Sequence, residues 1–202
     1  MGHVGCRSAE GGMRRYDFAE RLGWSEGHAP TIEHVSRILV DRIPGCTHIT
    51  GASNADNRRG TDFLAHRRGL SPLRIDLKLR DSDCTDYGKD DLALETWSKI
   101  EKTEPHPYSP FVSGTSVGWT RDASKNTDLI LWHWRSTGRF CLVPFPPLCN
   151  AFSRLWRDWA ARFPCASQDS GAWYSQCVYT PRGVVLHTLL RWMNSGQEVQ
   201  TQ

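Results

Sequence analysis

Three observations predict that this chain of 202 residues folds as a single α/β or α+β domain, with a mixed sheet flanked by helices. Its length suits one domain with a substantial core, and its hydrophobic content of 39% is ordinary for a globular protein. Strand-like alternation of polar and apolar residues recurs after residue 45. Helical patterns precede these segments and return near the carboxyl terminus, so helices and strands are expected to share one core.

The amino-terminal residues are rich in glycine, charged residues and turn formers. We therefore expect residues 1–30 to form an arm, with one short helical pattern at YDFAERLGW. The single domain, residues 31–202, then begins with a helix over residues 32–43. Apolar residues recur there at helical spacing, Thr31 can cap the first turn, and Pro44 with Gly45 ends the pattern.

Four strand-like segments follow this helix: CTHITGA, TDFLAHR, LRIDLKLRD and DLALETWSKI. The turn-rich stretches SNADNRRG and RRGLSP separate the first three of them. The third segment alternates most regularly, since its odd positions from Leu73 to Leu79 are apolar and its even positions from Arg74 to Arg80 are charged. It is therefore predicted to be a strand with its apolar face on the core.

The carboxyl-terminal half is predicted to extend a motif core over residues 31–98 with a hairpin and helices over residues 99–202. TDLILWHWR and GRFCLVPF are typical of a hairpin, and an amphipathic helix begins after it at the two prolines of FPPLCNAF. A strand near 173–179 and a helix near 182–193 complete the chain. Most of the nine tryptophans occupy apolar positions of these elements, so we expect them in the core.

The sequence shows no targeting signal and no cysteine pattern typical of a disulfide framework or a metal site. No apolar run approaches the length of a membrane-spanning helix, and the amino terminus lacks the apolar core of a signal peptide. We expect a cytoplasmic protein without a membrane partner. The seven cysteines are scattered and form no C-x-x-C pair, which favours reduced thiols over disulfides or a zinc site.

Basic residues are concentrated in one part of the chain, although the formal net charge is only +3. The pairs Arg58/Arg59 and Arg67/Arg68 lie in the two turns around the TDFLAHR segment. Such arginines would suit a polyanion such as nucleic acid. The alternative interpretation is a pair of ordinary solvated basic loops.

The charged face of the alternating segment carries the candidate chemistry. Asp76 and Lys78 are two residues apart and so about 7 Å apart along one face of a strand. If the preceding segment pairs antiparallel through the RRGLSP turn, Asp62 comes to lie beside Asp76. Carboxylate oxygens are the ligands that Mg²⁺ prefers, so two aspartates beside a lysine indicate a divalent-cation site.

Such a site suits phosphodiester hydrolysis. A bound Mg²⁺ lowers the pKa of a coordinated water and neutralises charge on a phosphate, while a neighbouring lysine orients the nucleophile or stabilises the anion. The alternative is a salt-bridged surface, with Asp76 paired to Arg74 or Lys78, because alternating charges on an exposed face are common.

An acid followed by D-x-K on adjacent strands, after a helix bearing a glutamate, resembles the PD-(D/E)xK nuclease superfamily, which includes restriction endonucleases and Holliday-junction resolvases. The resemblance spans about residues 31–98. It identifies Glu33 as the helix glutamate, Asp62 in GTDFLA as the first acid, and Asp76 and Lys78 in IDLKL as the second acid and the lysine. The blocks DLALETWS, GWTRDASKNTDLILW and FCLVPF are also similar to phage-borne proteins of this superfamily.

The sequence departs from the family pattern in two places. Thr61 stands where the family name has proline. Only about ten residues separate the Asp76 strand from the strand of Glu95, which is short for the usual crossover helix. Glu95 is therefore either a ligand from an adjacent antiparallel strand or a structural acid, and Glu33 either supports the site or pairs with Arg37.

The resemblance implies a restriction-endonuclease-like fold and a nuclease dependent on Mg²⁺ or Mn²⁺, acting on DNA, including branched or single-stranded DNA, in a bacterial or phage-infected cell. Asp62, Asp76, Glu95 and the backbone carbonyl of Leu77 would surround the metal, and Lys78 would lie beside the attacking water. Many such enzymes form homodimers, although no heptad pattern indicates one here.

The alternative function is a non-catalytic protein on the same fold that binds nucleic acid or inhibits another factor. Two aspartates in a phosphate-binding groove favour catalysis, because a pure binder gains nothing from acids facing phosphate. A third function, that of an enzyme that uses a cysteine or histidine on a small molecule, has no motif in its favour.

Overall fold

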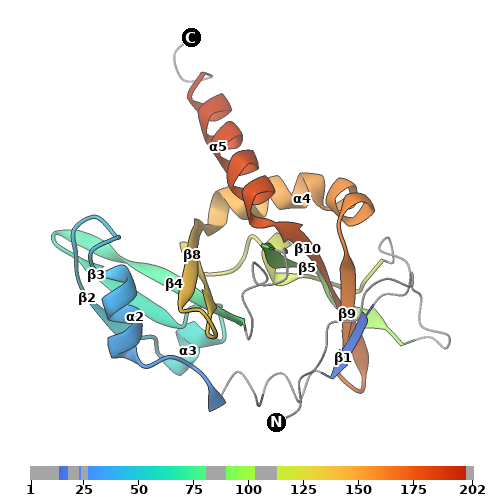
Figure 1. The fold of residues 1–202 in the computed structure, drawn as a ribbon, viewed down its shortest axis with the longest axis horizontal. Helices are drawn as coiled ribbons and strands as arrows, with labels where there is room; N and C mark the ends of the chain where they lie inside the picture. Colours follow the sequence, from blue (N-terminus) through green and yellow to red (C-terminus); the bar gives the residue numbers. More distant parts are fainter. Residues whose placement is uncertain (1–13, 18–22, 24–26, 81–89, 103–112, 199–202) are drawn as a thin grey trace.

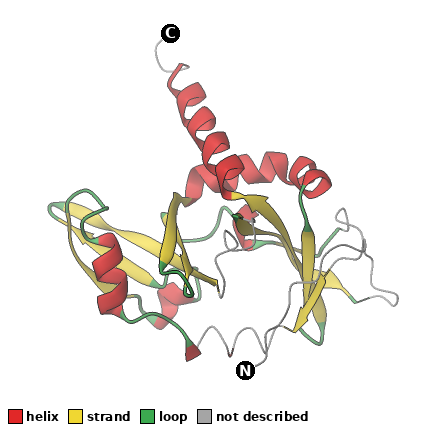
Figure 2. Ribbon diagram, in the orientation of Figure 1, coloured by secondary structure: helices red, strands yellow, loops and turns green. Residues whose placement is uncertain are grey.

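A computed structural model of the chain is described for residues 14–17, 23, 27–80, 90–102 and 113–198. Its strands form two five-stranded mixed sheets, with helices packed around them (Figures 1 and 2). Sheet A has the strand order β1-β9-β10-β5-β6, and sheet B has the order β2-β3-β4-β7-β8. The molecule is therefore an α+β protein.

Sheet B contains the strands that carry the predicted site. Its β2 (Cys46–Gly51), β3 (Phe63–Arg67) and β4 (Leu70–Arg80) are antiparallel neighbours. Strand β7 (Leu129–Trp134) pairs parallel to β4, and β8 (Arg139–Pro144) pairs antiparallel to β7.

Helix α2 (Ile32–Leu39) covers one face of sheet B (Figure 1). Thr31 caps its first turn by accepting a hydrogen bond from the His34 N–H at 3.3 Å. The helix ends four residues earlier than predicted. The following residues form turns, in which the Arg42 guanidinium donates to the Ile38 carbonyl at 2.6 Å, and Ile43 remains buried.

Sheet A is built from distant parts of the chain. Strand β10 (Trp173–Pro181) lies between β5 (Asp91–Glu101) and β9 (Cys165–Asp169), antiparallel to both. The short β6 (Ser116–Val117) pairs with β5. At the opposite edge, β1 (Arg14–Asp17) pairs parallel to β9, so these residues of the predicted arm belong to a sheet.

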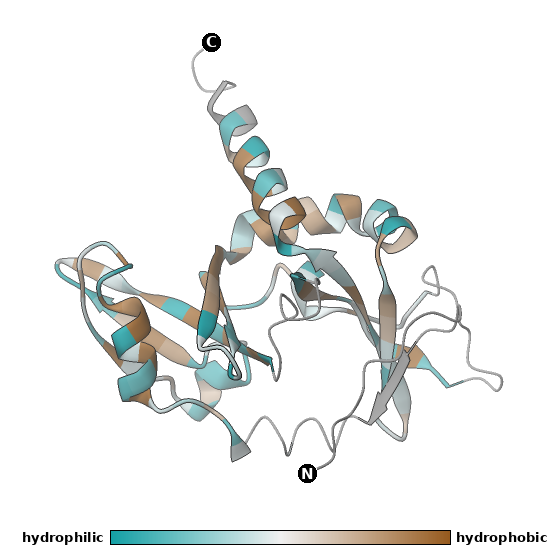
Figure 3. Cartoon of the chain, viewed as in Figure 1, coloured by the Kyte–Doolittle hydropathy of each residue, from teal (hydrophilic) through white to brown (hydrophobic). Residues whose placement is uncertain are grey.

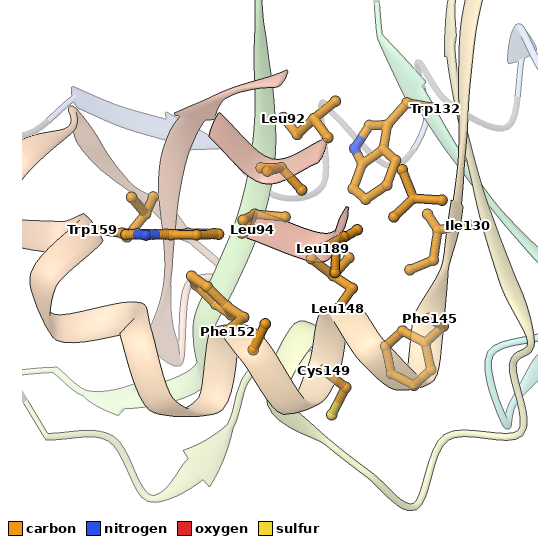
Figure 4. Packing of buried hydrophobic residues seen from close by; sticks show 14 of the residues in the cluster. Leu92, Leu94, Ile130, Trp132, Phe145, Leu148, Cys149, Phe152, Trp159 and Leu189 are labelled. Atoms are coloured by element: carbon orange, nitrogen blue, oxygen red, sulfur yellow. The ribbon is translucent and has the colours of Figure 1, made fainter. Parts of the chain in front are cut away.

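The main core lies where the two sheets meet α4 (Phe145–Arg162) and α5 (Arg182–Glu198). Figure 4 shows side chains of β5, β7, α4 and α5 converging there, including those of Leu94, Ile130, Phe152 and Leu189. Figure 3 shows hydrophobic and hydrophilic residues alternating along the strands and around α5, which projects from the body. As predicted, most tryptophans pack in or against this core.

The strands do not form the one central sheet that the sequence predicts. Strand β5 pairs with β10 because the free edge of β4 is taken by β7. The hairpin β7–β8, predicted as an extension, thus completes the sheet of β2, β3 and β4. The predicted elements otherwise occur close to their expected ranges, whereas β1, β6, β9 and α3 (Asn54–Asn57) were not predicted.

Two expectations concern the ends and the surroundings of the chain. Of the YDFAERLGW pattern, residues 16–24, the structure describes only Tyr16, Asp17 and Gly23. Tyr16 and Asp17 lie in β1, and the rest of the pattern lies outside the described residues. Among the helices of the described residues, none is long and apolar enough to cross a membrane.

Candidate active site

Strand register places Asp62 beside Asp76, on the face of sheet B opposite α2. Phe63 is the partner of Ile75 in the antiparallel ladder, and the Asp62 N–H donates to the Ile75 carbonyl at 2.8 Å. The two aspartates therefore occupy the next pair of positions and share a face. This is the arrangement that the TDFLAHR and LRIDLKLRD patterns predict.

The Asp62 carboxylate is fixed by two hydrogen bonds. Its Oδ2 accepts from the Leu77 N–H at 2.7 Å, and its Oδ1 accepts from Asn57 Nδ2 at 2.8 Å. Asn57 ends the short helix α3, which Ser53 caps. Burial, and then the charge of Asp76, raise the pKa of Asp62 to about 6, against the lowering effect of the Leu77 N–H.

Asp76 and Lys78 form a bidentate ion pair on the same strand. Lys78 Nζ lies 2.8 Å from Oδ1 and 2.7 Å from Oδ2 of Asp76. The side chain of Lys78 is 29% exposed and that of Asp76 is 11% exposed. Burial of the ammonium opposes its charge, but Asp76, Asp62 and Glu95 together raise the pKa of Lys78. The ammonium also lies 4.6 Å from the centroid of the Trp119 ring. Lys78 is therefore a charged group held in one place.

Glu95 faces this group from sheet A, across from sheet B rather than from a neighbouring strand of the same sheet. Its Oε2 accepts hydrogen bonds from Ser98 Oγ and from the Trp119 N–H, both at 2.8 Å. Burial raises the pKa of Glu95 above its usual value, and those two hydrogen bonds and the charge of Lys78 offset only part of this rise.

Gly118 allows the chain to approach Glu95 closely. A Cβ on Gly118 would lie 2.3 Å from the Glu95 carbonyl oxygen, which no other residue type tolerates. The 3₁₀ helix of residues Trp119–Arg121 begins immediately after it, so Trp119 reaches both Glu95 and Lys78. Glycine at this position is therefore part of how the site is assembled.

Glu33 is not brought to this group. It lies exposed in the first turn of α2, and α2 packs on the opposite face of sheet B. The pKa of Glu33 is lowered by its own backbone N–H and then by Thr31, as expected of an acid at a helix amino terminus. No ion pair joins Glu33 to Arg37 among the described residues. Neither of the two roles considered for Glu33, support of the site or pairing with Arg37, is therefore seen.

The two arginine pairs lie at opposite ends of β3. Arg58 and Arg59 are exposed in the loop that leads to Asp62. Arg67 and Arg68 lie at the β3–β4 turn, roughly 17 Å along the strand from Asp62, and Arg67 donates to the Ser71 carbonyl at 2.9 Å and 3.2 Å. Only the first pair borders the aspartates.

The oxygen donors here fit a hard divalent cation. Within an extended strand the N–H and C=O of one residue point to the same edge, so the Leu77 carbonyl shares the edge at which its N–H meets Asp62. In the described part of the chain, no group of three His, Cys, Asp or Glu side chains is arranged to hold a metal. Mg²⁺ is usually held by one or two carboxylates with water, which this pair of aspartates matches.

Sequence reasoning missed Asn57 and Trp119. Asn57 sits in the turn-rich SNADNRRG stretch, where Ser53 and Asp56 form a short capped helix whose signal is the serine followed by an acid three residues on. Trp119 was treated as one of many core tryptophans, and only its position after a glycine distinguishes it.

Comparisons of this chain with protein-family models, with curated proteins and with solved structures find no match.

Proposed function

We propose that this protein is a nuclease dependent on Mg²⁺ or Mn²⁺ that hydrolyses phosphodiester bonds of DNA. The observation that carries the proposal is the convergence of Asp62, Asp76 and Lys78 on one face of sheet B, with the Asp62 carboxylate anchored to the Leu77 N–H. Glu95 adds a third carboxylate from sheet A.

The fold supports a restriction-endonuclease-like assignment in part. Sheet B is mixed and has α2 on one face, as the resemblance to the PD-(D/E)xK superfamily implies. The connection from β4 to its parallel neighbour β7 departs from that family, because it contains β5 and β6 of sheet A instead of a single crossover helix.

Asp62, Asp76 and the Leu77 carbonyl would hold the cation, with Glu95 facing it. A divalent cation bound there would lower the pKa of a water and neutralise charge on the scissile phosphate. Asp62 is suited to this role because burial and the charge of Asp76 make its ionised form unfavourable without a cation.

Lys78 would act on the reacting groups directly. Its ammonium is charged, partly shielded from water and held between the Asp76 carboxylate and the Trp119 ring. From this position it can orient the attacking water or stabilise negative charge that develops on the phosphate. Its contact with both oxygens of Asp76 also means that a cation bound at Asp76 would share this carboxylate with the Lys78 ammonium, whose positive charge opposes cation binding.

A cleavage assay tests the proposal. The wild-type protein is incubated with duplex, single-stranded and branched DNA in the presence of Mg²⁺, Mn²⁺ or EDTA, and Asp76→Asn is run beside it. We expect divalent-dependent cleavage of at least one substrate by the wild type and none by Asp76→Asn, which must have an unchanged circular dichroism spectrum. Equal cleavage by both proteins would refute the proposal.

One observation favours the alternative of a non-catalytic binding or inhibitor protein. Lys78 already neutralises Asp76 through both carboxylate oxygens, so the pair is satisfied without a cation. If the wild type cuts no substrate under any metal, and Asp76→Asn binds DNA or a protein partner as the wild type does, this alternative replaces the nuclease.

A further inference from the structure

The segment 118–128 connects the two sheets on its way from β6 to β7. At its beginning, the Glu95 N–H of sheet A donates to Thr120 Oγ1 at 2.8 Å. At its end, the Arg74 N–H of sheet B donates to Asp128 Oδ2 at 2.8 Å, and the Asp128 N–H donates to the Arg74 carbonyl at 2.9 Å. Residues in the middle of this segment are therefore held near both the Glu95 side and the aspartate side of the candidate site.

The same segment is tied to the loop that precedes Asp62. The Asn126 N–H donates to the Arg59 carbonyl at 3.0 Å, and Thr61 Oγ1 donates to the Asn126 carbonyl at 2.5 Å. Thr127 Oγ1 donates to the Gly60 carbonyl, also at 2.5 Å. These three hydrogen bonds fix Asn126 and Thr127, which follow Lys125, against residues 59–61.

Gly60 provides the space that the Lys125 side chain occupies. Its φ of 90° lies in the region that favours glycine. A Cβ on Gly60 would lie 3.1 Å from Lys125 Cδ and 3.1 Å from Thr127 Oγ1, so the aliphatic part of Lys125 runs across this residue. The lysine is thus packed onto the loop of Asp62 and is not an isolated surface side chain.

Among the described residues, the Lys125 ammonium differs from that of Lys78 in having no carboxylate partner. Lys78 contacts both oxygens of Asp76, whereas Lys125 has neither an ion pair nor a side-chain hydrogen bond with any residue that the structure describes. Its side chain nevertheless lies beside the site, because it packs across Gly60, two residues before Asp62. Within the part of the chain that the structure describes, Lys78 is thus paired with a carboxylate at the site and Lys125 is not.

A phosphodiester strand needs such a cation here. The carboxylates of Asp62, Asp76 and Glu95 would repel the phosphates on either side of the one that reacts, because Lys78 and a divalent cation held at the site would act mainly on the reacting phosphate. We propose that Lys125 is a positioning residue that contacts a phosphate of the bound strand beside the reacting one, a role that rests on the proposed nuclease function. The contact displaces counterions and holds the strand in register without recognising bases.

Binding of a single-stranded DNA dodecamer tests this role. Fluorescence anisotropy is measured over a range of salt concentrations in an Asp76→Asn background, which prevents cleavage during the measurement. Lys125→Met keeps a long apolar side chain over Gly60 and removes the charge, whereas Lys125→Arg keeps the charge. Lys102→Met is the matched control, since the Lys102 ammonium lies 2.8 Å from the Asp169 carboxylate, away from the site.

We expect Lys125→Met to bind about fivefold more weakly at 0.1 M salt and to reduce the salt slope by about 0.7, as for one lost phosphate contact on a single strand. Lys125→Arg should restore both values, and Lys102→Met should change neither. In the cleaving background, Lys125→Met should raise KM with little change in kcat, because it removes binding that is shared by ground state and transition state.

An unchanged affinity and salt slope for Lys125→Met would overturn the assignment. So would an equal loss of affinity in Lys125→Arg with a lowered melting temperature, because packing over Gly60 would then be the cause. Absence of cleavage by the wild type would refute the nuclease function alone, since the binding comparison does not depend on it. If the parent protein does not bind the dodecamer, the assignment of Lys125 fails, while the nuclease function still depends on the cleavage assay.

Discussion

The two faces of sheet B differ in chemistry although the same strands build both. On the α2 face, Ile75 and Leu131 pack with Val35 and Leu39 in an apolar cluster. On the opposite face, Asp76 and Lys78 of β4 lie next to Ile130 and Trp132 of β7, which belong to the main core. Charged side chains of β4 therefore lie directly beside core side chains of the neighbouring strand β7.

This difference shows how a sheet can hold a charged site in place. The apolar face fixes the backbone of β4, and alternation then fixes the positions of the charged side chains on the other face. The charged face is a cost to the folded protein, because burial and the charge of Asp76 disfavour the ionised form of Asp62. Groups that are unfavourable for folding and precisely positioned are typical of functional sites.

Ile75→Ala should have the largest effect on stability and no direct effect on the site chemistry. Ile75 of β4 is fully buried on the face of sheet B that α2 covers, and truncating such a side chain costs about 2–5 kcal/mol of unfolding free energy. Urea denaturation measures this loss. Asp76→Asn, one residue further along β4, is the comparison and should lose less stability, so a larger loss for Asp76→Asn would contradict the division between the two faces.

Asp62→Asn should stabilise the protein at high pH. The pKa of Asp62 is raised from 3.8 to about 6, so the folded state binds its proton more tightly than the unfolded state does. Wild-type stability should therefore fall as the pH rises from about 4 to about 6 and stay lower above that range. The asparagine variant lacks this loss and should be more stable at pH 8, by up to about 3 kcal/mol.

Thermal unfolding of both proteins at pH 4 and pH 8, without divalent cations, measures the effect. The asparagine carbonyl can still accept the Leu77 N–H, and the exposed Asn57 amide can turn to accept from the new amide, so the hydrogen bonds survive the change. A variant that is less stable than the wild type at both pH values would show that Asp62 is a structural acid.

Arg67→Ala with Arg68→Ala should have the smallest effect. Both residues lie at the β3–β4 turn, at the far end of β3 from Asp62. The double variant should weaken binding of long DNA equally for all sequences and reduce its salt slope, because these contacts would be to phosphates. A trinucleotide bound at the aspartates is too short to reach the β3–β4 turn, so its binding should stay unchanged. If the double variant binds the trinucleotide more weakly as well, the DNA does not lie where this account places it.

The local part of the site could be predicted from the sequence. The alternation of residues 73–80 and the turn before them define a hairpin, and antiparallel pairing then brings Asp62 to Asp76. These are contacts between residues that are close in the sequence, for which periodicity and turn signals are sufficient.

The remaining part depends on pairings between distant segments. Glu95 reaches the site because β5 pairs with β10, about eighty residues away, and nothing in the local pattern of either strand specifies that partner. Lys125 and Trp119 belong to a connection without a strand or long-helix pattern, and their positions depend on hydrogen bonds to β5 and to the loop before Asp62. Glu33 shows the reverse case, since its helix was predicted but the face of the sheet that this helix covers was not.

Calorimetric titration with Mn²⁺ tests most directly whether the charged face of sheet B is a cation site. The wild type should bind Mn²⁺, and Asp76→Asn should bind it weakly or not at all, because a carboxylate ligand is lost. Lys78→Met should retain or strengthen binding, because it removes the ammonium that contacts both oxygens of Asp76, and it should still fail to cleave DNA. Equal Mn²⁺ binding by the wild type and Asp76→Asn, or no binding by any of the three proteins, would contradict the account.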